Sequence, residues 1–146
     1  MLTDEQAARK WLGRARMIDR EITALTDAKR ETREQLTRIT QNYSADGAQT
    51  SKDPHKYDKL AELESLIDSK VYELCQIKAE ITAAIIQIPD GRRRCVLLSY
   101  YVRCMTLEQI AVEMSYNYRH IKRLLREGIT EIALSSQAHG NENRIN

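Results

Sequence analysis

Residues 106–126 read TLEQIAVEMSYNYRHIKRLLR, and their order predicts two short helices joined by a tight turn. Thr106 and Gln109 have the spacing of a capping box, in which both side chains bind free backbone amides at a helix start. Asn117 is a second residue of the helix-capping type. Apolar side chains recur at helical spacing after each cap, and they predict the buried positions Ile110, Ala111, Met114, Ile121 and Leu124.

The turn between the two predicted helices falls at Ser115 and Tyr116. Glycine is common at the end of a helix because it adopts a left-handed backbone without strain. If Ser115 is left-handed, serine costs roughly 1 kcal/mol relative to glycine. Ala111 lies where the two helices approach closely, and Tyr116 is expected in the core between them.

The second predicted helix has a basic exposed face, formed by Arg119, Lys122, Arg123 and Arg126. No acid occurs between Asn117 and Arg126. Such a cluster neutralises DNA phosphates, and arginine also reads guanine edges in the major groove. An ordinary solvated helical face is the alternative, but the caps and buried positions together favour DNA binding.

Other residues are candidate DNA contacts with structural alternatives. Tyr118 could contact a phosphate or a thymine methyl, or it could pack against the preceding turn. His120 could contact a phosphate or simply be solvated. Thr106, at the start of the first of the two helices, is also a candidate DNA contact. The run Arg92, Arg93 and Arg94 could clamp the DNA backbone, or it could be a solvated basic run.

Charge is unevenly distributed along the 146 residues, whose formal net charge is +2. Residues 90–146 carry nine Lys and Arg against six Asp and Glu, whereas the preceding residues carry 14 against 15. The start, MLTDEQAARK, predicts no signal peptide, and no apolar run is long enough to span a membrane. Cys75, Cys95 and Cys104 are expected to be reduced core residues, which indicates a cytoplasmic protein.

Two long helices are predicted before residue 89. Residues 3–41 and 56–88 have apolar stripes, and the loop 42–55 is rich in Ser, Asp, Gly and Thr. The second stripe comprises Leu60, Leu63, Ile67, Val71, Leu74, Ile77, Ile81, Ile85 and Ile88. The simplest arrangement is an antiparallel helical hairpin, residues 1–88. Lys29 and Thr32 interrupt the first stripe: they could fix register, mark a partner or solvent, or be a local lapse.

Pro89, Asp90 and Gly91 end the second long helix. A helix over residues 92–102 then joins the pair around Ser115 in a three-helix unit, residues 89–135. A flexible polar tail is expected over residues 136–146. The predicted fold is therefore all-α: a long antiparallel hairpin followed by a three-helix unit.

Catalysis has little support in the sequence. His55, His120 and His139 lie far apart, without cysteine or carboxylate at metal-ligand spacing. No glycine-rich phosphate loop occurs. We expect no enzyme activity, no cofactor and no metal.

Residues 90–133, containing RRRCVLLSYYVRCMTLEQIAVEMSYNYRHIKRLLREGITEIA, resemble the region-four DNA-binding unit of bacterial sigma factors. The N-terminal pattern, ITQNYSADG followed by DKLAELESLID, resembles small phage and mobile-element proteins of uncharacterised function, to which ArpU-like phage transcriptional regulators are related. This resemblance implies a phage or mobile-element transcriptional regulator. Tyr118, Arg119, Lys122 and Arg123 would then reach base edges or nearby phosphates.

The resemblance also has limits and alternatives. Sigma factors often have an acid at the Arg119 position and glutamine at the Arg123 position, so it gives no promoter sequence. No region-two segment for melting DNA is recognised. The partners it implies are double-stranded DNA, with RNA polymerase or a second copy bound through the hairpin. A DNA-packaging component like a small terminase subunit, or a polymerase-binding module without DNA binding, remains open.

Overall fold

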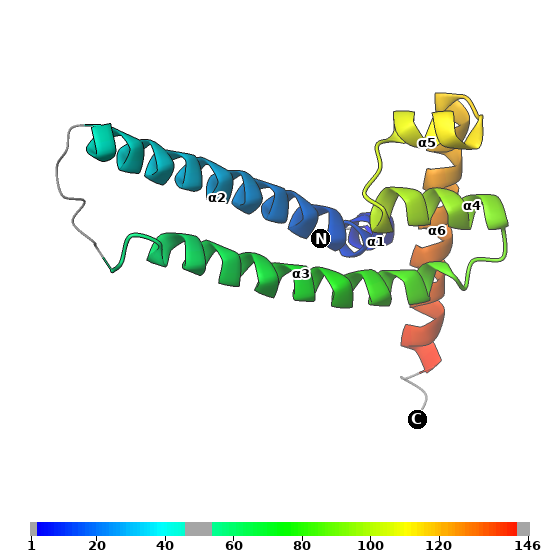
Figure 1. Cartoon of the computed structure of the whole chain (residues 1–146). Helices are drawn as coiled ribbons and strands as arrows, with labels where there is room; N and C mark the ends of the chain where they lie inside the picture. Colours follow the sequence, from blue (N-terminus) through cyan, green and yellow to red (C-terminus); the bar gives the residue numbers. More distant parts are fainter. Residues whose placement is uncertain (1–2, 46–53, 143–146) are drawn as a thin grey trace. The chain divides into compact units, whose positions relative to one another are not determined.

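The computed structural model describes residues 3–45 and 54–142, and every regular element in these ranges is helical, as expected. Figure 1 shows their order along the chain. The elements are α1 (Asp4–Leu12), α2 (Arg14–Ala45), α3 (Asp58–Ile85), α4 (Gly91–Leu97), the π-helix η1 (Leu98–Val102), α5 (Leu107–Met114) and α6 (Tyr118–Glu142). None of the helices in the described ranges is both long enough and apolar enough to cross a membrane.

The described residues form two compact units. Unit 1 comprises those within Met1–Met17 and Cys75–Asn146, and unit 2 comprises those within Ile18–Leu74. The expected division at residue 88 differs from this one, because α1 and the end of α3 belong with α4, α5 and α6. Unit 1 is therefore built from two stretches of the sequence that are separated by unit 2.

Several helix boundaries differ from the predicted ones. Gly13 divides the first predicted segment into α1 and α2, and a capping box of Thr3 and Gln6 begins α1. α2 extends past the predicted end, and α3 begins slightly later than expected. Residues 136–142, expected in a flexible tail, are helical in α6. Residues 46–53 of the expected loop and 143–146 of the expected tail lie outside the described residues.

Two ion pairs join α2 to α3 within unit 2. Lys70 Nζ lies 3.1 Å from Glu21 Oε2, and Lys29 Nζ lies 3.4 Å from Glu64 Oε1. Residue numbers rise on α2 as they fall on α3, so the paired segments run in opposite directions. The hydrogen bond with Glu21 is the main reason that the pKa of Lys70 is raised. These exposed pairs specify register more than they add stability.

The two polar residues that interrupt the first apolar stripe, Lys29 and Thr32, each have a partner close by. Lys29 reaches across to Glu64, and the Thr32 hydroxyl donates to the Ala28 carbonyl, 2.8 Å away on its own helix. Of the second stripe, Val71 is 42 % exposed, which contradicts its expected burial. An apolar repeat of seven residues drifts around a straight helix with 3.6 residues per turn, so its positions do not all stay on the buried face.

The core of unit 1 is aliphatic and draws on five helices. Its fully buried large side chains are Leu12, Ile81, Ile85, Val96, Leu97, Ile110, Ile121 and Ile129. α6 packs against both α1 and α4. The closest approach is at Gly128, where an added Cβ would lie 2.7 Å from Leu97 Cδ1 and 3.0 Å from Leu97 Cγ. α6 can therefore pack this closely on α4 only because residue 128 has no side chain.

Arg16 secures the segment between α4 and α5. Its guanidinium donates to the carbonyls of Tyr100 and Met105, at 2.8 and 3.0 Å, and lies 4.0 Å from the centroid of the Tyr100 ring. The neighbouring Tyr101 is buried, and that burial raises its pKa to about 12. Because η1 ends in carbonyls without helical partners, a guanidinium from another helix satisfies them.

The expectation that the cysteines lie in the core is wrong. Cys75 and Cys95 are exposed, Cys104 is half-buried, and none of the three forms a disulfide. Cys75 follows the buried Leu74, and Cys95 precedes the buried Val96. Neighbours in a helix point about 100° apart, so a residue beside a core position commonly faces outward.

We predict that Gly128→Ala lowers the free energy of unfolding by about 1–2 kcal/mol, because the methyl group overpacks against Leu97. The gain in helix propensity, up to about 1 kcal/mol, only partly offsets this. Leu97→Ala should cost about 2–5 kcal/mol. In the Leu97→Ala background the space is open, so Gly128→Ala should be neutral or stabilising. Urea unfolding followed by circular dichroism measures all four proteins, and an equal effect of Gly128→Ala in both backgrounds would contradict the proposed contact.

Candidate nucleic-acid interface

α5 and α6 are joined by a turn whose hydrogen bonds define where each helix starts and stops. The Thr106 hydroxyl accepts from the Gln109 amide at 3.2 Å, and the Gln109 side chain accepts from the Thr106 amide at 2.9 Å. Ser115 is left-handed, with φ 56° and ψ 39°, as the sequence suggested for this turn. Asn117 Oδ1 accepts from the His120 amide at 2.8 Å and caps α6.

The buried face of this helix pair is the predicted one in its main positions. Ile110, Ile121 and Leu124 are buried. Ala111, Met114 and Tyr116 are half-buried. Tyr116 packs edge-on against His120, with ring centroids 4.7 Å apart, so both rings close the turn.

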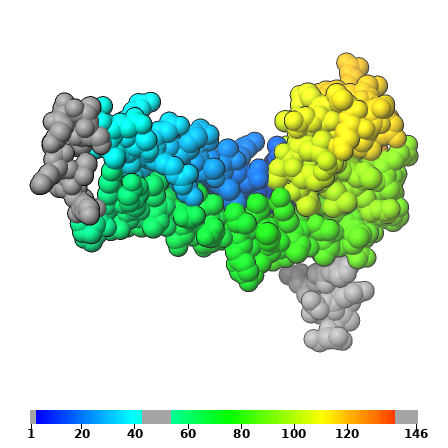
Figure 2. All heavy atoms as spheres, viewed as in Figure 1, coloured from blue at the N-terminus to red at the C-terminus, as the bar shows by residue number. Residues whose placement is uncertain are grey.

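The opposite face of α6 is basic and open to solvent. Its exposed side chains are Arg119, Lys122, Arg123 and Arg126. In Figure 2 the atoms of α5 and of the start of α6, coloured yellow to orange, form a continuous exposed surface. Within the described chain, Arg119, Lys122 and Arg126 form no ion pair, so their charges face solvent uncompensated.

One flank of this face is hollowed. The hollow is lined by Asn117, Arg119, His120, Arg123 and Arg126. Arg123 Nη2 lies 2.7 Å from His120 Nδ1. Since a guanidinium only donates, Nδ1 is the acceptor in this contact, and Nε2 carries the imidazole proton. The hollow therefore offers several donors, and none of its lining residues is an acid.

The other flank carries an aromatic ring. Tyr118 is 41 % exposed, and Lys122 Nζ lies 5.5 Å from the centroid of its ring. This cation–π contact holds the lysine stem over the tyrosine. Tyr118 is thus available to a ligand on its exposed edge.

The three arginines of α4 have different partners. Arg94 Nη1 donates to the carbonyls of Ile88 and Pro89, at 2.6 and 3.0 Å. Arg93 binds Glu127, with Nε 3.1 Å from Oε2, and also binds Glu131. Arg92 is the most exposed, and its guanidinium lies 3.6 Å from Asp90. Arg93 and Arg94 therefore serve internal contacts, which the sequence did not indicate when it grouped all three as a possible clamp.

Asp90 explains why this run begins a helix. Its carboxylate accepts from the amides of Arg92 and Arg93, at 2.8 and 3.4 Å. The backbone hydrogen bond from Arg92 is the main reason that the pKa of Asp90 is lowered. The side chains of Arg92 and Arg93 consequently leave α4 in different directions.

Sequence reasoning missed two residues near this interface. Glu127 lies 3.8 Å from Arg123 through Oε1, and its spacing four residues after Arg123 could have revealed the pair. Arg16 stabilises the connection into α5 from a distant part of the chain. Nothing in the sequence around Arg16 indicates that contact, because only the folded chain creates it.

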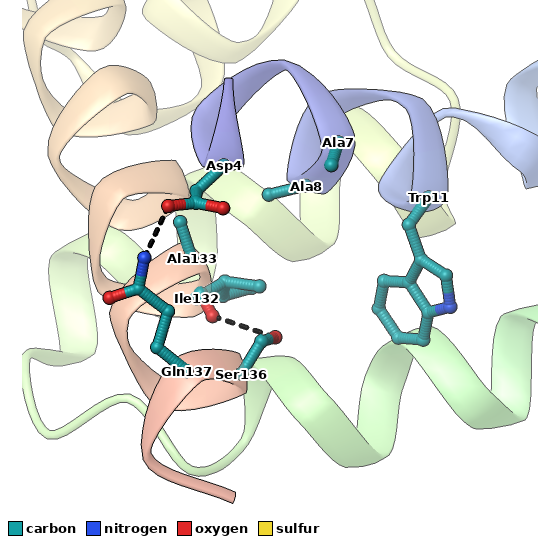
Figure 3. Close-up of a pocket in the computed structure, with 8 residues that line it drawn as sticks. All are labelled: Asp4, Ala7, Ala8, Trp11, Ile132, Ala133, Ser136 and Gln137. Carbon is teal, nitrogen blue, oxygen red and sulfur yellow. Dashed lines mark hydrogen bonds between the residues drawn. The ribbon is translucent and has the colours of Figure 1, made fainter. Parts of the chain in front are cut away.

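A second hollow lies between α1 and α6, away from the basic face (Figure 3). Trp11, Ala7 and Ala8 line it from α1, and Ile132 and Ala133 line it from α6. The Gln137 side chain donates to Asp4 at its edge. In the described part of the chain, no three His, Cys, Asp or Glu side chains gather as metal ligands would.

No family model matches this chain, and neither a curated protein nor a solved structure matches it with statistical significance.

Proposed function

We propose that this chain is a DNA-binding transcriptional regulator similar to sigma region four, in which α5, the Ser115 turn and α6 form a helix-turn-helix. The hairpin of α2 and α3 would precede this three-helix unit. The observation that carries the proposal is the exposed basic face of α6, opposite the buried Ile121 and Leu124. An α-helix fits the major groove of B-DNA, and the bases there present distinct donor and acceptor patterns.

The two flanks of α6 suit different parts of the DNA. The hollow lined by Arg119, Arg123 and Arg126 presents clustered positive charge, which suits a phosphate group. Tyr118 and Lys122 present a ring edge and a flexible ammonium, which suit a thymine methyl and a base acceptor. Arg123 belongs to the same hollow, and its guanidinium could also reach a guanine edge.

Only one arginine of α4 suits a backbone contact. The guanidinium of Arg92 is 60 % exposed and touches only the carboxylate at the start of its own helix. Arg94 would have to leave two carbonyls, and Arg93 three carboxylates, before either could bind a phosphate. We therefore propose Arg92 alone as the backbone contact from α4.

A single unit of this size binds DNA modestly, since such interfaces bury about 600–1,000 Å². Useful occupancy needs a second attachment, through a second copy of the chain or through RNA polymerase. Light scattering by the intact chain tests this: a stable dimer supports self-association, and a monomer at micromolar concentration contradicts it.

We predict that the chain binds duplex DNA with a strong salt dependence. For about four to six phosphate contacts, log K should fall with log salt at a slope of roughly −4 to −5. Arg126→Ala should reduce the magnitude of that slope by about one. Arg30→Ala, which removes an exposed charge from α2, should leave the slope unchanged. Fluorescence anisotropy measures both, and no binding at low salt would refute the proposal.

We predict that Arg123→Ala changes the preference among DNA sequences and weakens binding to the best site by about 1–3 kcal/mol, because a base contact is lost. Arg94→Ala should instead lower thermal stability and leave sequence preference unchanged, because its partners are backbone carbonyls. Selection from a random duplex pool, followed by sequencing, measures the preference. Identical preferences for wild type and Arg123→Ala would show that Arg123 contacts only the DNA backbone.

A further inference from the structure

The basic face of α6 ends at an acid that competes for one of its arginines. Glu127 Oε1 lies 3.8 Å from Arg123 Nε, so the carboxylate can bind the same guanidinium that a phosphate would bind. One turn later, Glu131 adds a second carboxylate on this side of the helix.

Arg93 of α4 binds both of these acids at once. Its Nη2 lies 3.0 Å from Glu127 Oε2, and its Nη1 contacts Glu131 Oε1. Burial alone would lower the pKa of Arg93, but hydrogen bonds to Glu131 and Glu127 raise it. The planar guanidinium can serve two carboxylates because its donors project in fixed directions, which a lysine cannot match.

Arg93 directs its Nε, Nη1 and Nη2 at these two carboxylates. The second carboxylate oxygen of Glu131 is buried and has no hydrogen-bond partner among the described residues. The two acids thus need more positive charge and more donors than Arg93 supplies. Moving Arg93 to a phosphate would leave Glu131 without its cation and Glu127 with only Arg123, at a considerable cost in free energy.

We propose that Arg93 is a positioning residue for DNA binding: it holds Glu127 and Glu131 on the α4 side of α6, and so keeps Glu127 Oε1 3.8 Å from Arg123 Nε instead of at hydrogen-bonding distance. This inference rests on the proposed DNA-binding function. Arg93 itself touches no DNA. Its effect is indirect, since without it Glu127 turns to Arg123 and withdraws that side chain from the exposed face.

A double-mutant cycle tests the inference in the intact chain. Arg93→Gln should weaken duplex DNA binding about five- to tenfold, whereas Glu127→Gln alone should strengthen it about twofold. The double variant should bind about as well as Glu127→Gln, because no acid then competes for Arg123. Arg93→Lys should recover only part of the affinity lost in Arg93→Gln, since it keeps a cation beside the acids without the fixed donors of the guanidinium.

Arg92→Gln is the matched control, because it removes the same charge from the adjacent position of α4. It should weaken binding about twofold, and Glu127→Gln should add to it only the about twofold gain that it gives in the wild-type chain. If Glu127→Gln likewise adds no more than about twofold to Arg93→Gln, Arg93 is a direct phosphate contact or a purely structural residue, and the inference is overturned. If Arg93→Gln does not fold, Arg93→Lys and Glu127→Gln still test the inference. It is overturned if Arg93→Lys binds DNA as well as the wild-type chain, or if Glu127→Gln does not strengthen binding.

A measurement without DNA separates this inference from the proposed function. The Nε–H resonance of Arg123 in the free chain should shift and exchange more slowly with water in Arg93→Gln, because Glu127 then holds it. The double variant should return it to the wild-type behaviour. An Arg123 signal that does not respond to Arg93→Gln overturns the inference, even if the wild-type chain binds no DNA. A wild-type chain that binds no DNA refutes the proposed function whatever this signal does.

Discussion

The approach of α6 to α4 at Gly128 and Leu97 is the contact on which the rest of unit 1 depends. A side chain at residue 128 would have to occupy the volume of the Leu97 methyl groups. Because a helix is a rigid rod over a few turns, seating Gly128 against α4 also sets the rotation of the residues before it. Arg119, Arg123 and Arg126 face solvent because they lie on the side of α6 opposite that contact.

The same contact brings the start of α4 beside the middle of α6. Arg93 then meets Glu127 and Glu131, and Arg94 turns back to the carbonyls of Ile88 and Pro89. Arginines in α4 and arginines in α6 therefore differ in availability although they are chemically identical. What separates them is whether a carboxylate or an orphan carbonyl lies within reach, because a buried acceptor without a donor is unfavourable.

Much of the local structure follows from residue type and spacing. The capping box at Thr106, the left-handed turn at Ser115 and the buried Ile110, Ile121 and Leu124 are all readable in residues 106–126. These features depend on hydrogen bonds and periodicity within a few residues, and distant parts of the chain do not alter them. The exposure of Cys75 and Cys95 could not be predicted from composition, because the direction in which each helical position points decides it.

The sequence by itself determined the helical class, the turn and the basic face of α6, because each is encoded by neighbours along the chain. Only the tertiary structure decided that α1 packs on α6, that Arg16 closes the segment before α5 and that Arg93 binds acids. These are contacts between residues tens of positions apart. Their partners are chosen when apolar faces are buried together, and one-dimensional spacing carries no record of that choice.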